Sequence, residues 1–245
     1  MSSEKRVIPL ESNPDIFNEL SYKLGLSPVL QFHDLYSLTD PDLLSFIPQP
    51  VYAIIMLFPL TETYEAYRRQ TDAVDSPSTA AYANEKTTDI KWFKQTIGNA
   101  CGLYALLHIL ANLPQDFIIS SSILKDSLLR QITKYSSVED VSRLVENLES
   151  DIQLDSNYGV QGQTAAPSAQ DSVDLHFVTF IKSPHDGHLY ELDGRRNGPI
   201  DLGKSSDAPH ILDDPKVVEK VQFYMNNTDE KNKHNFSIMA IAPGL

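Results

Sequence analysis

The chain reads Gln95-Thr96-Ile97-Gly98-Asn99-Ala100-Cys101 directly before the apolar run Gly102-Leu103-Tyr104-Ala105-Leu106-Leu107-His108. This pattern predicts a polar loop followed by a helix that begins at Cys101, the one cysteine of the sequence. The N-terminus of a helix carries about half a positive charge, which favours a thiolate over a thiol. A cysteine that only fills a core needs no such loop, so the arrangement indicates a nucleophile.

The composition is that of a globular protein with an acidic surface. With 245 residues, of which 41% are hydrophobic, the chain can form one large domain with its own core. A single cysteine excludes an internal disulfide and is typical of a reducing compartment. The net charge of −13 disfavours a nucleic-acid partner, because such binding depends on Lys and Arg contacts to phosphate. A basic partner fits this charge, and a surface that only maintains solubility is the alternative.

The sequence shows no sign of a membrane or secretory segment. The N-terminal residues Met1–Arg6 lead into no long apolar region. The longest apolar run, Val51–Leu60, is interrupted by Pro59 and is too short to span a bilayer, so it predicts a buried strand. We therefore expect no membrane partner and a cytoplasmic location, with the nucleus as a second intracellular compartment.

Helix and strand patterns follow one another without a regular βαβ alternation, which favours the α+β class with an antiparallel sheet. Asn13 and Pro14 predict the start of a helix that Gly25 ends. We expect further helices after Thr39, from Cys101 to about Asn112, at Ile123–Ile132, at Val138–Leu148 and at Asp213–Met225. We expect strands at Arg6–Leu10, Gln31–Leu38, Val51–Phe58, Val173–Ile181, His188–Asp193 and Phe236–Ile241.

Two long segments lack a strong pattern. Thr61–Asp89 is polar and predicts a surface excursion with one helical piece around Tyr64–Gln70, to which we assign no function. Asp151–Asp171 has no periodicity and is rich in Gln, Ser, Gly and Ala. Loops longer than about 12–15 residues are uncommon inside compact domains unless they are functional or disordered. This second loop directly precedes the strand that contains His176.

A cysteine nucleophile requires an imidazole, a group that orients the ring, and a donor for the oxyanion. The chain offers seven histidines. His108 lies on the helix of Cys101, about 10 Å along its axis, and is expected in the core. His33 has no distinctive neighbours, His210 and His234 lie among polar loop residues, and His185 and His188 fall at a hairpin tip. His176 lies inside the predicted strand Val173–Ile181, where a histidine is either satisfied by the core or directed at a functional partner.

The predicted hairpin selects a carboxylate for His176. If residues 184–187 form the turn, His176 and Asp193 become diagonal neighbours on one face, about 7–8 Å apart at their backbones and within reach of each other's side chains. A bulge would change this parity. Asp186 lies in the turn itself and Asp201 lies beyond the second strand, so Asp193 is the best candidate.

Gln95 is the candidate for the oxyanion donor. Its side-chain amide can lie beside the backbone N–H of Cys101, and two such donors together form an oxyanion hole. An ordinary surface glutamine is the alternative, and the spacing of Gln95 and Cys101 does not decide between the two.

The segment Gln95–Gly102, followed by an apolar helix that ends in His108, resembles the active-site signature of the ubiquitin C-terminal hydrolases, peptidase family C12. The resemblance continues in the family's order through the whole chain, which is most similar to the small fungal members. It includes Glu11–Pro14, Val51–Pro59, Leu175–Phe177 and Tyr190–Gly194. It therefore implies that residues 1–245 form one catalytic domain.

The resemblance implies a papain-like α-β-α arrangement, with a mostly antiparallel six-stranded sheet between helices and a knotted chain path. It implies that Cys101 is the nucleophile, His176 the base and acid, Asp193 the residue that orients the ring, and Gln95 a donor in the oxyanion hole. It also implies that Asp151–Asp171 crosses over the active site.

The substrate implied by the resemblance is ubiquitin, or a ubiquitin-like protein such as NEDD8, that carries a small adduct or short extension on its C-terminal glycine. No cofactor and no metal are expected, and the protein is expected to be a monomer. Three alternatives remain: a catalytically weak protein that binds and stabilises ubiquitin, a redox sensor without a resolving cysteine, and an unrelated papain-like peptidase that acts on ordinary peptides.

Overall fold

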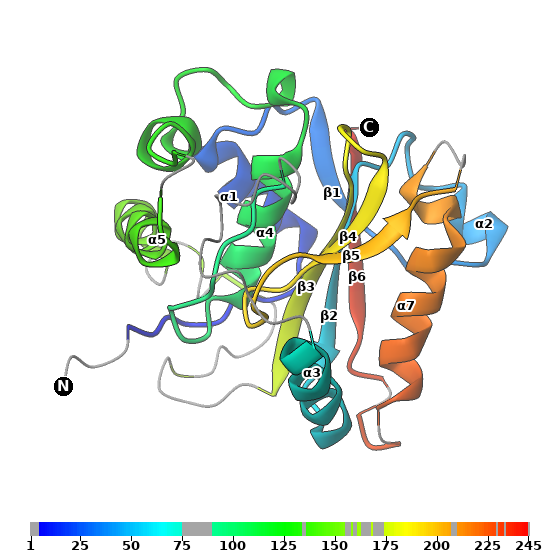
Figure 1. Cartoon of the computed structure of the whole chain (residues 1–245). Coiled ribbons are helices and arrows are strands. Elements are labelled where there is room, and N and C mark those ends of the chain that lie inside the picture. The colour runs from blue at the N-terminus through cyan, green and yellow to red at the C-terminus, as the bar shows by residue number, and fades with distance from the viewer. Residues whose placement is uncertain are drawn as a thin grey trace.

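The computed structural model contains one six-stranded sheet with helices on both faces (Figure 1). It describes residues 5–74, 90–133, 136–154, 158, 161–162, 168, 174–206, 210–228, 230–232 and 234–244. Within these ranges no helix has the length and apolar character that a membrane span requires.

The strands are β1 (Leu30–Asp34), β2 (Ala53–Pro59), β3 (Leu175–Lys182), β4 (His188–Leu192), β5 (Ile200–Lys204) and β6 (Ser237–Pro243). Their order in the sheet is β1-β6-β2-β3-β4-β5, and every neighbouring pair is antiparallel. The α-helices are α1 (Pro14–Leu24), α2 (Pro41–Leu44), α3 (Glu62–Val74), α4 (Cys101–Asn112), α5 (Val138–Ile152) and α7 (Pro215–Asn226). Short helices of other types lie at Gln115–Phe117, Leu124–Leu129 and Ile211–Asp213.

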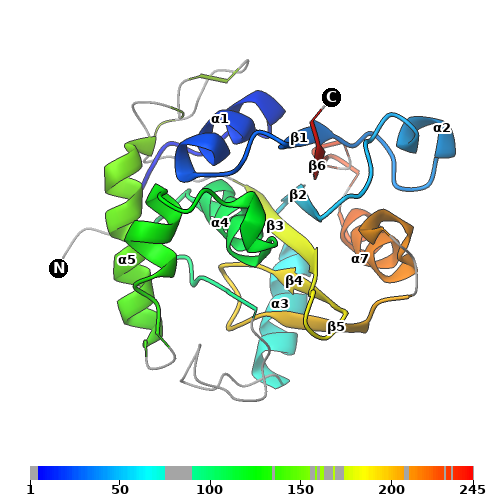
Figure 2. The same cartoon turned by 90° about the horizontal axis from the view of Figure 1, so that it is seen from above.

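The sheet separates two layers of helices, as Figures 1 and 2 show from two directions. Helices α1, α4 and α5 cover one face, and α7 lies on the other. Each face has its own apolar core. Strand β2 supplies both, because alternate side chains of a strand point to opposite faces: Ile55 belongs to the first core, and Ile54 and Met56 belong to the second. The predicted α+β fold with a sheet between helices is confirmed.

The predicted helix starts are confirmed where their capping residues indicated them. The Asn13 side chain accepts a hydrogen bond from the backbone N–H of Asp15, and Pro14 is the first residue of α1. Gly25 ends this helix with φ of 118°, a left-handed conformation that a side chain would strain. The helix of Cys101 begins and ends at the predicted residues, Cys101 and Asn112.

One predicted strand is wrong, and one strand was not predicted. Residues Arg6–Leu10 form no strand, because only Arg6 pairs, in an isolated bridge to Gly98. The sixth strand is instead β5, which the sequence analysis did not predict. This edge strand is half exposed and contains Gly203 at φ of 88°, so it lacks the apolar alternation that reveals a strand. The helix expected at Ile123–Ile132 is present as a six-residue π-helix, Leu124–Leu129.

The two segments without a strong pattern contribute to the core. Helix α3 begins the supposed surface excursion, yet Tyr64 is only 4% exposed. Helix α5 extends into the predicted loop as far as Ile152, and Leu154 and Tyr158 are also buried, so this part of the loop is core. Residues 75–89 and most of 155–171 lie outside the described residues, and the expected crossing of the active site falls there.

Segments that are far apart in the sequence come together at one end of the central strands. Strand β2 ends where β3 begins, with Phe58 paired to His176, and β4 ends beside them just before Asp193. Helix α4 packs across β3, where the Thr179 hydroxyl donates to the carbonyl oxygen of Ala105 over 3.0 Å. The start of α4 therefore lies over the end of the sheet at which strand β3 begins.

Candidate active site

Cys101 is the first residue of α4 and is 8% exposed. Asn99 turns the chain into the helix with a positive φ of 62°. Among the described residues no side chain caps this helix start, although the first backbone N–H groups of a helix have no partner within it. The thiol thus lies beside N–H groups that can donate hydrogen bonds to a developing negative charge.

His176 is buried next to Asp193. The hairpin pairs Thr179 with Leu192 and Lys182 with Leu189, which confirms the register that the sequence predicted. With this register the side chains of His176 and Asp193 meet, and Nε2 of the imidazole lies 2.7 Å from Oδ1 of the carboxylate. Both side chains are almost fully removed from solvent, at 2% and 0% exposure.

The side chain of Cys101 interacts with the same imidazole and contributes to its pKa shift. Because Nε2 is engaged by Asp193, the nitrogen that faces the thiol is Nδ1. Burial alone lowers the pKa of His176, but the negative charge and hydrogen bond of Asp193, together with Cys101, raise it to about 9. An imidazole with a raised pKa can hold the proton that a thiolate–imidazolium pair requires.

Asp193 is held by donors from three other segments. Its Oδ1 accepts from His176 and from the backbone N–H of Arg195 at 2.8 Å, and its Oδ2 accepts from the Tyr64 hydroxyl at 2.6 Å. Burial raises the pKa of this carboxyl, but the charge of His176 and these hydrogen bonds outweigh it and hold the pKa well below its ordinary value. The Trp92 indole N–H donates to the Asp193 carbonyl oxygen over 2.9 Å.

Gln95 lies in the loop that leads to Cys101 and is tied to the turn after Asp193. Its backbone N–H donates to the Gly194 carbonyl oxygen over 2.8 Å, and a Cβ on Gly194 would lie 2.9 Å from the Cβ of Gln95. Glycine therefore permits this close approach. The Gln95 side-chain amide donates to the carbonyl oxygen of Ile97 over 3.1 Å. Because a glutamine amide has two N–H donors, one remains for a ligand.

The remaining histidines lie outside this group. His108 is buried as expected: its Nε2 lies 3.0 Å from the backbone N–H of Phe93, and burial lowers its pKa to about 4. His188 pairs with Asp201 at the partly exposed hairpin, and His185 and His234 are exposed. Among the described residues no group of three or more His, Cys, Asp and Glu side chains could hold a metal ion.

Two residues of the site were missed by the sequence analysis. Tyr64 lies in the polar segment to which no function was assigned, and no pattern in that segment distinguishes it. Trp92 is the one tryptophan of the chain and lies three residues before Gln95, which was a usable signal. Both contact Asp193 only because the fold brings residues more than 100 positions apart together.

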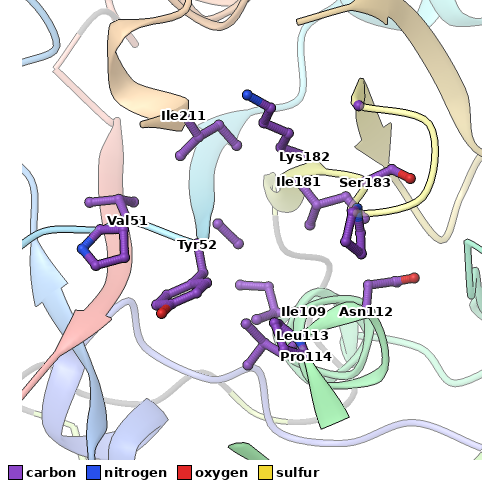
Figure 3. A pocket seen from close by; sticks show the side chains of 14 residues that line it. Val51, Tyr52, Ile109, Asn112, Leu113, Pro114, Ile181, Lys182, Ser183 and Ile211 are labelled. Atoms are coloured by element: carbon purple, nitrogen blue, oxygen red, sulfur yellow. The ribbon is translucent and has the colours of Figure 1, made fainter. Parts of the chain in front are cut away.

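The molecule also has a cavity of about 390 Å³ away from these residues (Figure 3). It lies at the opposite end of β2 and β3, where Ala53 pairs with Ile181, and Ile109 and Leu113 at the end of α4 form another wall. None of the four candidate residues lines it. The candidate chemistry therefore lies at one end of the sheet and this cavity at the other.

A thiol, an imidazole beside it and a buried carboxylate hydrogen-bonded to that imidazole are the groups that a cysteine hydrolase requires. Comparison with known proteins agrees. The profile of ubiquitin carboxyl-terminal hydrolase, family 1, matches residues 7–226. Ubiquitin carboxyl-terminal hydrolase YUH1 of Saccharomyces cerevisiae is 36% identical, with 99% of both chains covered. Ubiquitin carboxyl-terminal hydrolase 3 of Arabidopsis thaliana is 35% identical, with 98% of this chain and 96% of the relative covered.

The solved structure of Trichinella spiralis UCH37 bound to ubiquitin vinyl methyl ester has the same fold. Its TM-score is 0.66 at 21% identity, and the match covers 97% of this chain and 82% of that chain. The present chain belongs to the ubiquitin carboxyl-terminal hydrolase family. It is a thiol-dependent deubiquitinating hydrolase.

Proposed function

We propose that the chain is one catalytic domain that hydrolyses small adducts and short extensions from the C-terminal glycine of ubiquitin, with Cys101, His176 and Asp193 as the catalytic triad. The observation that carries the triad is the position of His176, whose ring is hydrogen-bonded to the Asp193 carboxylate and also interacts with the Cys101 side chain. One ring can then hold a proton for the thiolate and also be oriented by the carboxylate.

The proposed reaction has two steps. The Cys101 thiolate attacks the carbonyl carbon of the terminal glycine, and the bond to the leaving group breaks as the His176 imidazolium gives that group its proton. The resulting thioester is attacked by water, whose proton His176 takes. The carbon–sulfur bond then breaks, which releases the ubiquitin carboxylate and restores the thiolate. Asp193 stays ionised throughout and holds the ring.

The oxyanion formed in each step would be stabilised by the backbone N–H of Cys101 and the free side-chain N–H of Gln95. Two observations support this proposal: the uncapped start of α4 has backbone donors beside the thiol, and the contact of Gln95 with Gly194 fixes the loop that leads to Cys101. Gln95→Ala should therefore lower kcat by about 10²–10³ and change the affinity for ubiquitin little, because the donor acts mainly in the transition state. A change in KM alone would remove Gln95 from this role.

The proposal of ubiquitin as the substrate is supported by the names of the relatives and by the acidic net charge of −13, which suits a basic partner. Labelling with ubiquitin and with NEDD8 that carry a C-terminal electrophile decides between the two modifiers. Faster labelling by ubiquitin is expected. Faster labelling by NEDD8 would assign the enzyme to the other modifier, and no labelling by either would refute the proposal.

Cys101→Ser is the direct test of the nucleophile. Turnover of a fluorogenic ubiquitin C-terminal amide should fall by at least about 10³-fold, because an alkoxide forms far less readily than a thiolate. Binding of ubiquitin, measured by calorimetry, should persist because the substitution replaces one atom. Turnover retained in pure Cys101→Ser protein would exclude Cys101.

Selectivity for small leaving groups is the remaining part of the proposal. The first part of the predicted crossover segment is held in the core by the buried side chains of Leu154 and Tyr158. Further along, the backbone of Gly162 lies so close to Glu11 that a Cβ at this glycine would clash with the Glu11 carboxylate. We propose that a segment anchored at these points limits the leaving group. Inserting flexible residues beside Gly162 should allow cleavage of folded di-ubiquitin and change small-adduct turnover little. Continued rejection of di-ubiquitin would place the size limit elsewhere.

A further inference from the structure

Helix α3 reaches the proposed triad through one side chain. The Tyr64 hydroxyl donates to Oδ2 of Asp193 over 2.6 Å, and the tyrosine is 4% exposed. Its ring meets the ring of Phe58 edge-on, with centroids 4.9 Å apart, and Phe58 in turn meets the ring of His176 at 5.8 Å. Tyr64 thus contacts the carboxylate directly and the imidazole through Phe58.

The hydrogen bond from Tyr64 gives the second oxygen of the Asp193 carboxylate a donor. Oδ1 of Asp193 faces His176 and the Arg195 backbone N–H, whereas Oδ2 faces the Tyr64 hydroxyl. With donors on both oxygens, rotation of the carboxylate about its bond to Cβ would break hydrogen bonds in a buried site. The cost of an unmade hydrogen bond there is high.

We propose that Tyr64 is a positioning residue of this enzyme, which holds the Asp193 carboxylate in the rotation that orients His176 toward Cys101. This inference rests on the proposed triad. Tyr64 contacts neither the thiol nor any reacting atom in this arrangement. It would act only through Asp193, and this restriction makes the inference testable.

The ion pairs that hold α3 in place are consistent with this role. Glu65 pairs with Arg195 at 2.8 Å, and Asp72 pairs with the almost fully buried Arg196 at 3.1 Å. The helix is therefore fixed to the two residues that follow Gly194 in the turn after the catalytic aspartate. On the other side of that turn, Trp92 and Gln95 bind its backbone, as described above. The turn after Asp193 is therefore held from both sides, by α3 and by the loop that leads to the nucleophile.

Tyr64 remains a donor throughout the working pH range. Burial and the negative charge of Asp193 both raise the pKa of its hydroxyl far above the ordinary value for tyrosine. The proton of the Tyr64–Asp193 hydrogen bond therefore stays on the phenol, and the carboxylate stays charged.

Tyr64→Phe tests the inference, because it removes the hydroxyl and keeps the ring in the core. Tyr67→Phe is the matched control: Tyr67 lies one turn further along α3, and its hydroxyl accepts from Lys220 over 2.8 Å, away from Asp193. On a fluorogenic ubiquitin C-terminal amide, kcat of Tyr64→Phe should fall about 10-fold, as expected for one hydrogen bond to a charged group. KM should stay unchanged, and Tyr67→Phe should stay within about twofold of wild type.

A double-mutant cycle separates positioning from general support of the fold. Two rates are measured in an Asp193→Ala background: the alkylation of Cys101 by iodoacetamide and the residual turnover. Adding Tyr64→Phe should lower each rate by less than about twofold, because the carboxylate through which Tyr64 acts is absent. Thermal unfolding of each variant confirms that the protein is folded.

Three results would overturn the inference: equal kcat for Tyr64→Phe and Tyr67→Phe, a loss confined to KM, or the full 10-fold loss in the Asp193→Ala background. Failure of the triad itself gives a different result, since His176→Ala and Cys101→Ser would then retain turnover whatever the Tyr64 variants do.

Discussion

The segment from β3 to β5 carries two histidine–aspartate pairs with similar nitrogen–oxygen separations. His176 lies 2.7 Å from Asp193, and His188 lies 2.9 Å from Asp201. The first pair is 2% and 0% exposed, whereas the second is 33% and 49% exposed. In sequence, each pair combines a strand histidine with an aspartate 13 or 17 residues later.

The difference between the pairs lies in their surroundings. Water and dissolved ions screen a pair at the surface, so such pairs contribute little. The buried pair is shielded, Tyr64 and the Arg195 backbone donate further hydrogen bonds to its carboxylate, and Cys101 interacts with its imidazole. Distance alone therefore does not make an imidazole useful for catalysis. A buried carboxylate with its own donors, and a thiol on the other side of the ring, are also needed.

The largest expected contrast comes from removing each imidazole. His176→Ala should lower turnover of a fluorogenic ubiquitin C-terminal amide by at least about 10³-fold, because neither the thiolate nor the leaving group then has a proton partner. His188→Ala should leave turnover within about twofold of wild type. If His188→Ala proved the more damaging change, the assignment of the two pairs would be reversed.

Removing each carboxylate charge should give a smaller contrast in the same direction. Asp193→Asn should lower kcat by on the order of 10², since the amide neither stabilises the imidazolium nor holds the ring as a carboxylate does. Asp201→Asn should have no measurable effect on kcat. Steady-state kinetics of both variants, at matched thermal stability, provide the comparison. Equal rates for Asp193→Asn and wild type would remove Asp193 from the triad.

The pH dependence of the rate should distinguish the pairs further. His176 must be protonated to pair with the thiolate, so kcat/KM should fall as the pH rises through about 9, the raised pKa of this ring. In Asp193→Asn the charge that raises this pKa is lost while burial still lowers it, so the alkaline limb should move down by about one unit or more. Asp201→Asn should keep the wild-type limb. An unmoved limb in Asp193→Asn would show that it reports another group.

The smallest effect concerns stability at the exposed pair. Asp201→Asn should change the free energy of unfolding by less than about 1 kcal/mol, as is usual for a surface ion pair. In a protein of this size such a change corresponds to a shift in Tm of at most roughly 2–4 °C. Differential scanning calorimetry at low and high salt measures it. A larger, salt-independent loss would mean that the exposed pair supports the hairpin more than its exposure indicates.

The sequence predicted most elements that carry a strong local signal. Capping residues and glycine located α1, and a polar loop before an apolar run located α4. The parity of the β3–β4 hairpin was predictable because side chains alternate along a strand, so a register fixes which residues share a face. Strand β5 was missed because an edge strand needs no apolar alternation.

The sequence by itself determined the nucleophile candidate, its helix and the neighbouring positions of His176 and Asp193, because these depend on local periodicity and on one short hairpin. Only the tertiary structure decided what holds the aspartate: Tyr64 lies 129 residues before it and Trp92 lies 101 residues before it. Such contacts leave no local sequence pattern, because the hydrogen-bond partner of a buried hydroxyl or indole N–H comes from a distant part of the chain. Burial lowers the pKa of His176, and the charge of the buried Asp193 that outweighs this effect likewise acts on the ring only when the helices and the sheet close around the site.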